Sequence, residues 1–311
     1  MVKISNDRSA GNAPAARGIV DRVPAPLLFL ASGFTQYAGA ALAVGLFGVL
    51  AAASVAWWRL AVSAVVLLAW RRPWRQHWTR RELAGAALFG IVLATMNVVF
   101  YIAIDYLPLG TAVAIEFLGP VAVAAVTGRG WRDRVGIALA AVGVVLLAGV
   151  QLEAGVNADV VIGLVAIAAS AAAWAGYILL GRRIAVKRDG ISALAVGMTA
   201  GALLYCPLAF GAVLPVVTDA GRLAAVVGIA VLSSVIPYAI EQVVLRRVTA
   251  ARFAILLALL PVTAAVTGAV LLNQRPTLLE VLGMVLVCAA IVLSAGRSVP
   301  EPAGPEGALP G

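Results

Sequence analysis

One carboxylate stands out in a strongly apolar chain: Glu116, in the run Pro108-Leu-Gly-Thr-Ala-Val-Ala-Ile-Glu116-Phe-Leu-Gly-Pro120. In a helix, Pro120 lacks the amide proton that would bond the Glu116 carbonyl, so the helix should kink and leave a free acceptor beside the carboxylate. Such a pair suits a cation, an ammonium group or a transported proton. The alternative is a structural carboxylate paired with Arg59.

Arg59, in Trp57-Trp58-Arg59, has two interpretations. Its planar guanidinium could bind a substrate carboxylate through two parallel hydrogen bonds. Its long side chain could equally extend to the outer membrane surface and keep the charge in water. Both interpretations stay open at this point.

Other polar and aromatic side chains recur inside apolar runs. Asn97 and Tyr101 are one helical turn apart and should face the same way. Glu241 follows Pro237 and precedes Arg246 closely, so it is either a gate or inner-site residue or half of an interfacial ion pair. Ordinary interhelical hydrogen bonds and a polar cavity explain such residues equally well. The further members of this set are Gln36, Tyr37, Trp174 and Tyr177, and Pro237 and Pro261 are further predicted kinks.

Residue combinations for enzyme chemistry are missing. The single histidine, His77, lies in a basic loop, and Cys206 and Cys288 lie inside apolar runs. Metalloprotease, rhomboid-type and aspartyl-protease sites and a phosphate-binding loop need residues that this sequence does not provide. We therefore expect no catalytic residue, no metal and no cofactor.

The elements that position these residues must lie in lipid. Of the 311 residues 63% are hydrophobic and 12% charged, with a mean hydropathy of +1.03, whereas soluble domains carry roughly 25% charged residues. Long apolar runs favour membrane helices over a barrel. At about 20 residues per span, we predict ten helices, over 25–46, 52–70, 83–104, 109–128, 134–151, 159–181, 191–213, 223–245, 251–272 and 278–296. Small residues such as Gly39, Gly85 and Gly90 should let these helices pack closely.

Basic residues assign the two sides of the membrane. They gather in alternate connections and in both tails, while the opposite loops hold only Arg222 and Arg275. Since short cytoplasmic loops retain Lys and Arg, both termini should be cytoplasmic. The net charge of +9 is thus a topology signal, and no nucleic-acid partner is expected. Residues 1–24 are predicted to be a flexible tail without a cleavable signal, and 297–311 a disordered one.

An internal repeat is predicted over 25–151 and 159–296. Leu107–Ala112, followed by Pro120, aligns with Val248–Phe253, followed by Pro261. Because each copy has an odd number of helices, the second enters the membrane from the opposite side, as in many secondary transporters. The predicted fold is an all-α integral membrane protein whose ten transmembrane helices form two inverted five-helix repeats, with function near the midplane.

Several motifs resemble the threonine/homoserine exporter branch, with EamA-type halves, of the drug/metabolite transporter superfamily. The similarity extends from the first predicted helix to the tenth. Its most specific motifs are Trp58-Arg59-Leu60-Ala61, Met96-Asn97-Val-Val-Phe100-Tyr101, Glu116-Phe117-Leu-Gly119-Pro120, Trp174-Ala-Gly-Tyr177 and Ile236-Pro237-Tyr238-Ala-Ile-Glu241.

The resemblance implies the fold of that superfamily, efflux of small hydrophilic amino acids across the bacterial inner membrane, and exchange for protons. Two positions that are commonly acidic in the family are Leu260 and Gln274 here, so Glu116 or Glu241 must carry any coupled proton. By position, the resemblance implies a central cavity lined by Gln36, Asn97, Tyr101, Glu116, Trp174, Tyr238 and Glu241.

Our hypothesis is an inner-membrane secondary transporter, surrounded by lipid, that exports small amino acids by proton-coupled alternating access. Glu116 would attract the amino group, and Arg59 or carbonyls freed at Pro120 and Pro261 would complete the site. One rival is an exporter of aromatic amino acids or larger amphiphilic metabolites. A second is a membrane scaffold that transports nothing.

Overall fold

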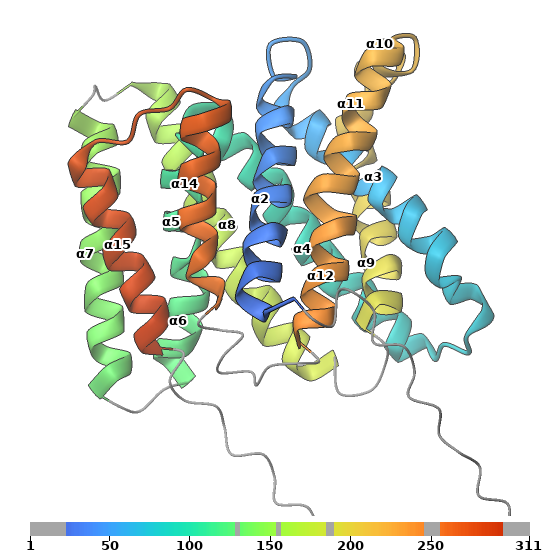
Figure 1. Ribbon diagram of the computed structural model, residues 1–311. Coiled ribbons are helices and arrows are strands. Elements are labelled where there is room, and N and C mark those ends of the chain that lie inside the picture. Colours follow the sequence, from blue (N-terminus) through green and yellow to red (C-terminus); the bar gives the residue numbers. More distant parts are fainter. Residues whose placement is uncertain (1–22, 128–130, 154–156, 185–189, 246–255, 295–311) are drawn as a thin grey trace, which may run out of the picture.

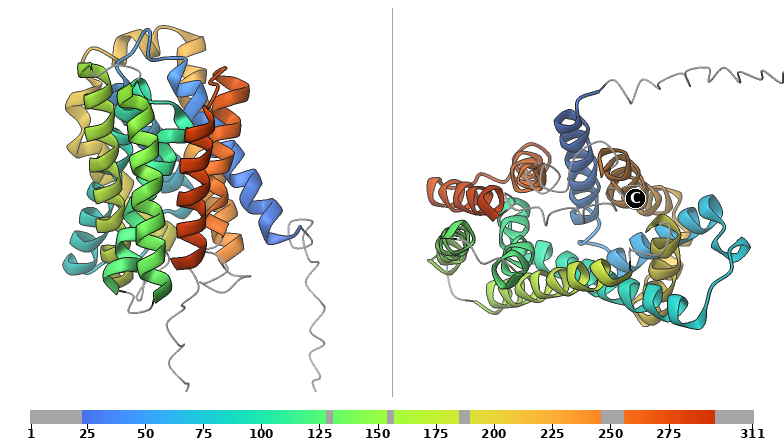
Figure 2. Two further views of the ribbon diagram at one scale, coloured as in Figure 1. Left: turned by 90° about the vertical axis from the view of Figure 1, so that its left-hand side faces the viewer. Right: turned by 90° about the horizontal axis from the view of Figure 1, so that it is seen from below.

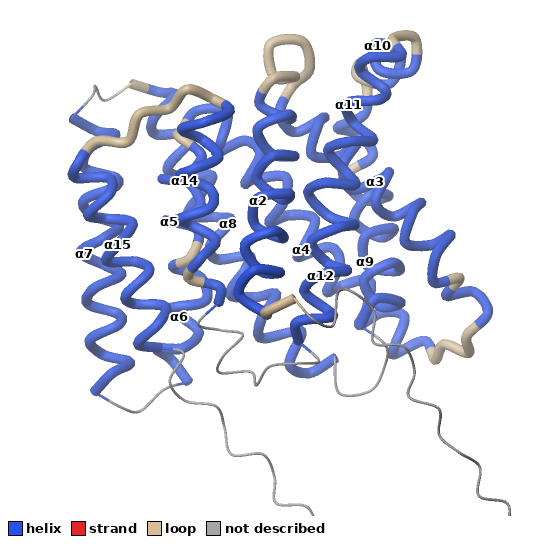
Figure 3. The backbone as a smooth tube through the Cα atoms, in the orientation of Figure 1, coloured by secondary structure: helices blue, strands red, loops and turns tan. Residues whose placement is uncertain are grey.

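The computed structural model describes residues 23–127, 131–153, 157–184, 190–245 and 256–294, and the regular secondary structure in these ranges is helical (Figures 1 and 3). The helices run side by side along one axis, and α2 begins at the end of the bundle where α15 finishes (Figures 1 and 2). We call this the basal end, and the end that carries the α2–α3 connection is called the distal end.

The elements are α2 (Ala25–Val44), α3 (Ala52–Arg71), η1 (Pro73–Arg75), α4 (Arg80–Tyr106), α5 (Leu109–Glu116), α6 (Leu118–Thr127), α7 (Trp131–Glu153), α8 (Ala158–Ile184), α9 (Gly190–Leu204), η2 (Cys206–Ala209), α10 (Val213–Val217), α11 (Ala220–Ala230), η3 (Val231–Val235), α12 (Ile236–Leu245), α14 (Leu259–Leu271) and α15 (Leu278–Ser294).

Six helical segments in the described part of the chain are long and apolar enough to cross a membrane. Several predicted ranges match the observed helices to within a few residues, for example 25–46 with α2 and 83–104 with α4. The predicted start at 251 lies outside the described residues. The six segments are Ala25–Val44, Ala52–Arg75, Arg80–Tyr106, Arg134–Leu152, Ala158–Leu180 and Ala220–Tyr238.

The described basic connections separate by end. The α3–α4 connection, which includes Arg72 and Arg75, lies at the basal end (Figure 1). The α14–α15 connection, with Arg275, and the start of α11, with Arg222, lie at the distal end. Among the described residues, the arginine-rich α3–α4 connection and these two segments therefore lie at opposite ends of the bundle.

Two predicted helices are less regular than expected. The range 191–213 was predicted as one helix, but α9 ends at Leu204. Pro207 cannot donate to the Leu203 carbonyl and disfavours helical geometry at the residue before it, so a short 3₁₀ turn, η2, and then α10 follow. The range 223–245 is interrupted by a π-helical segment, η3, at Val231–Val235.

The predicted kink at Pro120 is present as a break between α5 and α6 at Phe117. A corresponding break, at Ala258, precedes α14 and Pro261. Each break lies three residues before its proline, at positions that the repeat alignment pairs. The shared geometry follows from the missing amide proton at each proline.

Glycines bring neighbouring helices into backbone contact. A Cβ atom added to Gly90 of α4 would lie 2.0 Å from the backbone of Gly197 of α9. A Cβ on Gly143 of α7 would lie 2.7 Å from the carbonyl oxygen of Gly283 of α15. The close packing predicted at Gly90 is thus observed, and it sets the spacing of α4 and α9.

A buried carboxylate ties the start of α15 to two other helices. Glu280 is 5% exposed, and its Oε1 accepts hydrogen bonds from the Thr111 hydroxyl of α5 (3.1 Å) and the Gln151 amide of α7 (2.8 Å). Its Oε2 accepts from the Thr277 backbone N–H at 2.7 Å, and the Thr277 hydroxyl accepts from the Glu280 N–H at 3.2 Å. This reciprocal pair is a capping box.

We expect Glu280→Ala to lower the free energy of unfolding by about 3 kcal/mol, because it leaves several buried donors without an acceptor. Glu280→Gln should cost less, since its amide oxygen can still accept. Thermal unfolding of the detergent-solubilised protein measures both. Equal stability of Glu280→Ala and the wild type would contradict this structural role.

Candidate functional site

Arg59 points into the bundle from α3. It is 7% exposed, its Nε donates to the Ser234 hydroxyl at 3.0 Å, and its Nη2 donates to the Ser233 carbonyl at 2.7 Å. The guanidinium carbon lies 5.4 Å from the centre of the Tyr101 ring, within the range of a cation–π interaction. Of the two interpretations left open, this geometry matches an inward-facing group rather than one that extends to the membrane surface.

The partners of Arg59 come from the π-helical segment η3. There the Ile236 N–H bonds to the Val231 carbonyl, five residues back. Pro237 has no amide proton for the Ser233 carbonyl four residues before it. The Ser233 carbonyl is therefore available to Arg59, and π-bulges are frequent at functional sites for this kind of reason.

The same serine also reaches α2. The Ser233 hydroxyl donates to the Gln36 carbonyl at 3.0 Å. A Cβ on Gly39 would lie 2.2 Å from the Ser233 hydroxyl oxygen, so α2 and η3 are in direct contact. Ser233, which belongs to η3, thereby contacts both α2 and Arg59 of α3.

Glu116 is the last residue of α5 and is buried, at 7% exposure. Its carboxylate accepts a hydrogen bond from the Ser170 hydroxyl of α8. It lies within electrostatic range of Arg59, yet within the described part of the chain no carboxylate forms an ion pair with that arginine. Arg59 and Glu116 each use neutral partners and leave charge available to a third group.

The two groups lie at similar depth. Arg59 is seven residues beyond the first residue of α3, and Glu116 seven beyond the first residue of α5. Both helices begin at the distal end (Figure 1). At 1.5 Å per residue, both groups lie about 10 Å inside that end.

A second set of polar groups lies toward the basal end, around Glu241 of α12. Tyr238 and Tyr177 are within its electrostatic range, and the buried Ser32 hydroxyl lies near its carboxylate without a geometrically sound hydrogen bond. Glu241, Tyr177 and Tyr238 are each partly exposed. Arg246, the other half of the alternative ion pair, lies outside the described residues.

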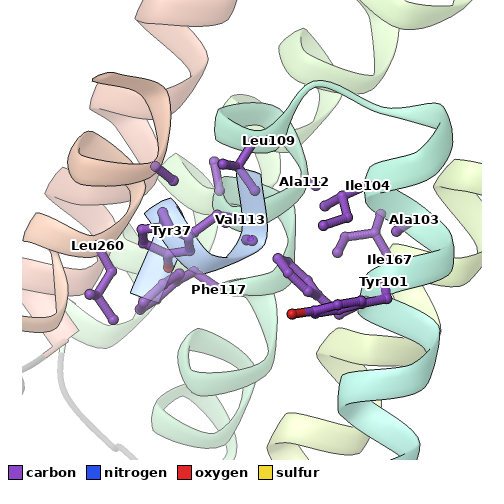
Figure 4. Close-up of a cluster of buried hydrophobic side chains, with 14 of the residues drawn as sticks. Tyr37, Tyr101, Ala103, Ile104, Leu109, Ala112, Val113, Phe117, Ile167 and Leu260 are labelled. Carbon is purple, nitrogen blue, oxygen red and sulfur yellow. The ribbon is translucent and has the colours of Figure 1, made fainter. Parts of the chain in front are cut away.

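Tyr37 is a buried tyrosine near both carboxylates. It is 3% exposed and within electrostatic range of Glu116, Glu241 and Arg59. It belongs to a buried cluster with Phe117 and Leu260 (Figure 4). Tyr37 is therefore close enough to feel the charges of both the distal and the basal polar groups.

The remaining candidates differ in their surroundings. Asn97 is buried and its amide donates to the Leu93 carbonyl of its own helix at 2.7 Å. The Tyr101 hydroxyl is buried and has no hydrogen-bond partner among the described residues. Trp174 is half-buried, with its ring edge-on to Phe117 at 4.6 Å. Tyr101 thus offers a free polar group, whereas the Asn97 amide already has a bond within its own helix.

Leu260 and Gln274, the two positions that are commonly acidic in the family, have neutral surroundings or a neutral partner in this structure. Leu260 is 4% exposed in the apolar cluster. The Gln274 side-chain oxygen accepts from the Leu109 N–H at 3.0 Å, which satisfies a donor at the start of α5. Neither position adds a charge to the site.

Sequence reasoning missed the serines of the site: Ser32, Ser170, Ser233 and Ser234. A lone serine in an apolar helix carries little signal, because its hydroxyl usually bonds within its own helix. Ser233 could have been identified from its position four residues before Pro237. Because Pro237 has no amide proton, the Ser233 carbonyl lacks its usual helical partner.

Comparisons with known proteins agree with this architecture. Residues 161–296 match the EamA-like transporter family. A protein of Salmonella typhimurium LT2 named threonine/homoserine exporter RhtA is 32% identical over 277 residues, covering 89% of this chain and 92% of that protein. The Escherichia coli K12 protein of the same name is 31% identical over 268 residues, covering 86% and 90%.

A solved crystal structure aligns with a TM-score of 0.56 at 20% identity, covering 86% of this chain and 95% of that one. At this identity the alignment supports the fold alone. The identity to curated exporters over most of both chains shows the family. This membrane protein therefore belongs to the EamA-like transporter family, in its threonine/homoserine exporter branch.

Proposed function

We propose that this protein exports small amino acids of the threonine/homoserine type across the bacterial inner membrane. The observation that carries the proposal is the arrangement of Arg59 and Glu116, two buried opposite charges at one depth that do not pair with each other. An amino acid carries a carboxylate and an ammonium group close together. Arg59 can bind the first and Glu116 the second, while the Tyr101 hydroxyl is available to a polar side chain.

The transport cycle is alternating access between two inverted five-helix repeats, 25–151 and 159–296. Arg59 and Glu116 belong to the first range and their partners Ser233, Ser234 and Ser170 to the second. Because the site is built from both ranges, movement of one range against the other changes the side of the membrane from which the site can be reached. The basal end, with its arginine-rich α3–α4 connection, faces the cytoplasm.

Protons are the counter-ion in this scheme. Glu116 and Glu241 are the carboxylates that can carry them, with Tyr37 within electrostatic range of both. Protonation of Glu116 from the outer side removes the charge that holds the ammonium group and so favours release there. Buried carboxylates in membrane helices commonly serve such relays.

Counterflow of labelled threonine in proteoliposomes tests the function. We expect uptake into vesicles preloaded with threonine or homoserine, and faster net flux when a pH gradient is imposed. The aromatic pairs near the site, Phe117–Trp174 and Phe89–Tyr177, favour the second candidate, an exporter of aromatic amino acids or larger amphiphiles. Stronger competition by phenylalanine than by homoserine would select that candidate and overturn the first.

A further inference from the structure

We propose that Ser233 and Ser234 hold Arg59 in a closed outer gate, which opens when a substrate carboxylate takes over the guanidinium. This inference rests on the proposed function, because it assigns a role to further residues of the same site. It makes the two serines positioning residues, since they would act through Arg59.

The distal layer of the site is closed. Arg59 and Glu116 are 7% exposed, and Tyr101, Ser233 and Ser234 are at most 2% exposed. The Phe47 ring, from the α2–α3 connection, covers Tyr101 edge-on at 6.2 Å. The basal groups around Glu241 keep partial exposure. The protein is therefore closed at the distal end, and this layer is what must separate for release there.

Side-chain bonds from α3 span the two ranges in this layer. The Ser54 hydroxyl donates to the Leu208 carbonyl at 2.7 Å, and the Trp57 indole N–H to the Ala202 carbonyl at 2.8 Å. Arg59, two residues beyond Trp57 along α3, adds its bonds to η3. Among these three residues only Arg59 is charged, so a substrate carboxylate can compete directly for its bonds.

The bond geometry places that competition on one edge of the guanidinium. A carboxylate binds a guanidinium best through two parallel N–H donors. Arg59 already directs Nε and Nη2, on one edge of its fork, to the Ser234 hydroxyl and the Ser233 carbonyl. A carboxylate on that edge must displace both, which breaks the link between α3 and η3. Substrate binding on this edge and release of the gate are then one event.

Cysteine accessibility tests the gate. Val55 is fully buried and lies one helical turn distal to Arg59 on the same face of α3. In a background with Cys206→Ser and Cys288→Ser, Val55→Cys is labelled with a membrane-impermeant maleimide in right-side-out vesicles. We expect slow labelling in otherwise wild-type protein and about tenfold faster labelling with Ser234→Ala, because a hydrogen bond to a charged group is lost.

Two matched variants control the result. Ser234→Thr keeps the hydroxyl and should label as slowly as the wild type. Ser63→Ala removes another buried hydroxyl from the same face of α3, near the Ala230 carbonyl at 3.5 Å, and should also label slowly. If Ser234→Ala labels no faster than Ser63→Ala, there is no such gate.

Substrate dependence separates this inference from the proposed function. Added threonine should speed the labelling of Val55→Cys in the protein with intact serines. Faster labelling with Ser234→Ala, but no response to threonine and no threonine flux, would keep the gate and reject the substrate. Threonine flux with unchanged labelling in Ser234→Ala would keep the function and reject the gate.

Discussion

Glu116→Gln is expected to lower the rate of threonine counterflow by about 100-fold. The replacement keeps the size of the side chain, and its amide oxygen can still accept from the Ser170 hydroxyl, so the fold should be retained. It removes the negative charge that binds the substrate ammonium group, and a charged hydrogen bond contributes roughly 1.5–3 kcal/mol. At 1.4 kcal/mol per tenfold change in affinity, the upper part of that range gives the predicted loss.

A matched acid-to-amide change separates this effect from a general loss of charge. Asp105 lies near the distal end of α4 and is exposed, so Asp105→Asn should transport like the wild type. The remaining flux of Glu116→Gln should also depend less on the pH gradient, because Gln cannot carry a proton and Glu241 is then the one proposed carrier left. Folded Glu116→Gln protein that exchanges threonine at the wild-type rate would refute the role of this carboxylate.

The helical architecture could be predicted from sequence because each signal is local. Long apolar runs, proline positions and arginine-rich connections give α2, α4 and the break at Phe117 to within a few residues. The prediction was poorest at 191–213. There the apolar composition continues past Leu204, so hydropathy did not detect the 3₁₀ turn that Pro207 imposes.

The site was only partly predictable, because its charged members are rare and its neutral members are not. A carboxylate or an arginine in an apolar helix costs free energy and is therefore rare unless it has a function. For this reason Glu116 and Arg59 can be identified as candidates from the sequence. Ser170 and Ser234 cost little in a helix, and only the three-dimensional arrangement shows that they are the partners of these charges. The π-helical register of η3 likewise depends on contacts that the sequence does not state.

The packing of α4 on α9 should be highly sensitive to added side-chain volume. We expect Gly90→Ala to lower the free energy of unfolding by about 3 kcal/mol or more, because overpacking of a buried contact commonly costs 1–3 kcal/mol and this methyl group would meet backbone rather than a mobile side chain. The nearest atoms are the Gly197 Cα and carbonyl carbon, both at 2.0 Å. Thermal unfolding in detergent and the yield of folded protein in membranes measure the effect.

Gly149→Ala is the matched control. Gly149 lies within α7, and a Cβ there would meet nothing within 4 Å. Because Ala favours a helix over Gly by roughly 1 kcal/mol, this variant should be as stable as the wild type or slightly more so. The same methyl group is thus added to two membrane helices, and only contact with α9 distinguishes them. Equal stability of the two variants would mean that α4 and α9 do not pack at Gly90, and the spacing that holds Asn97 and Tyr101 in the site would need another origin.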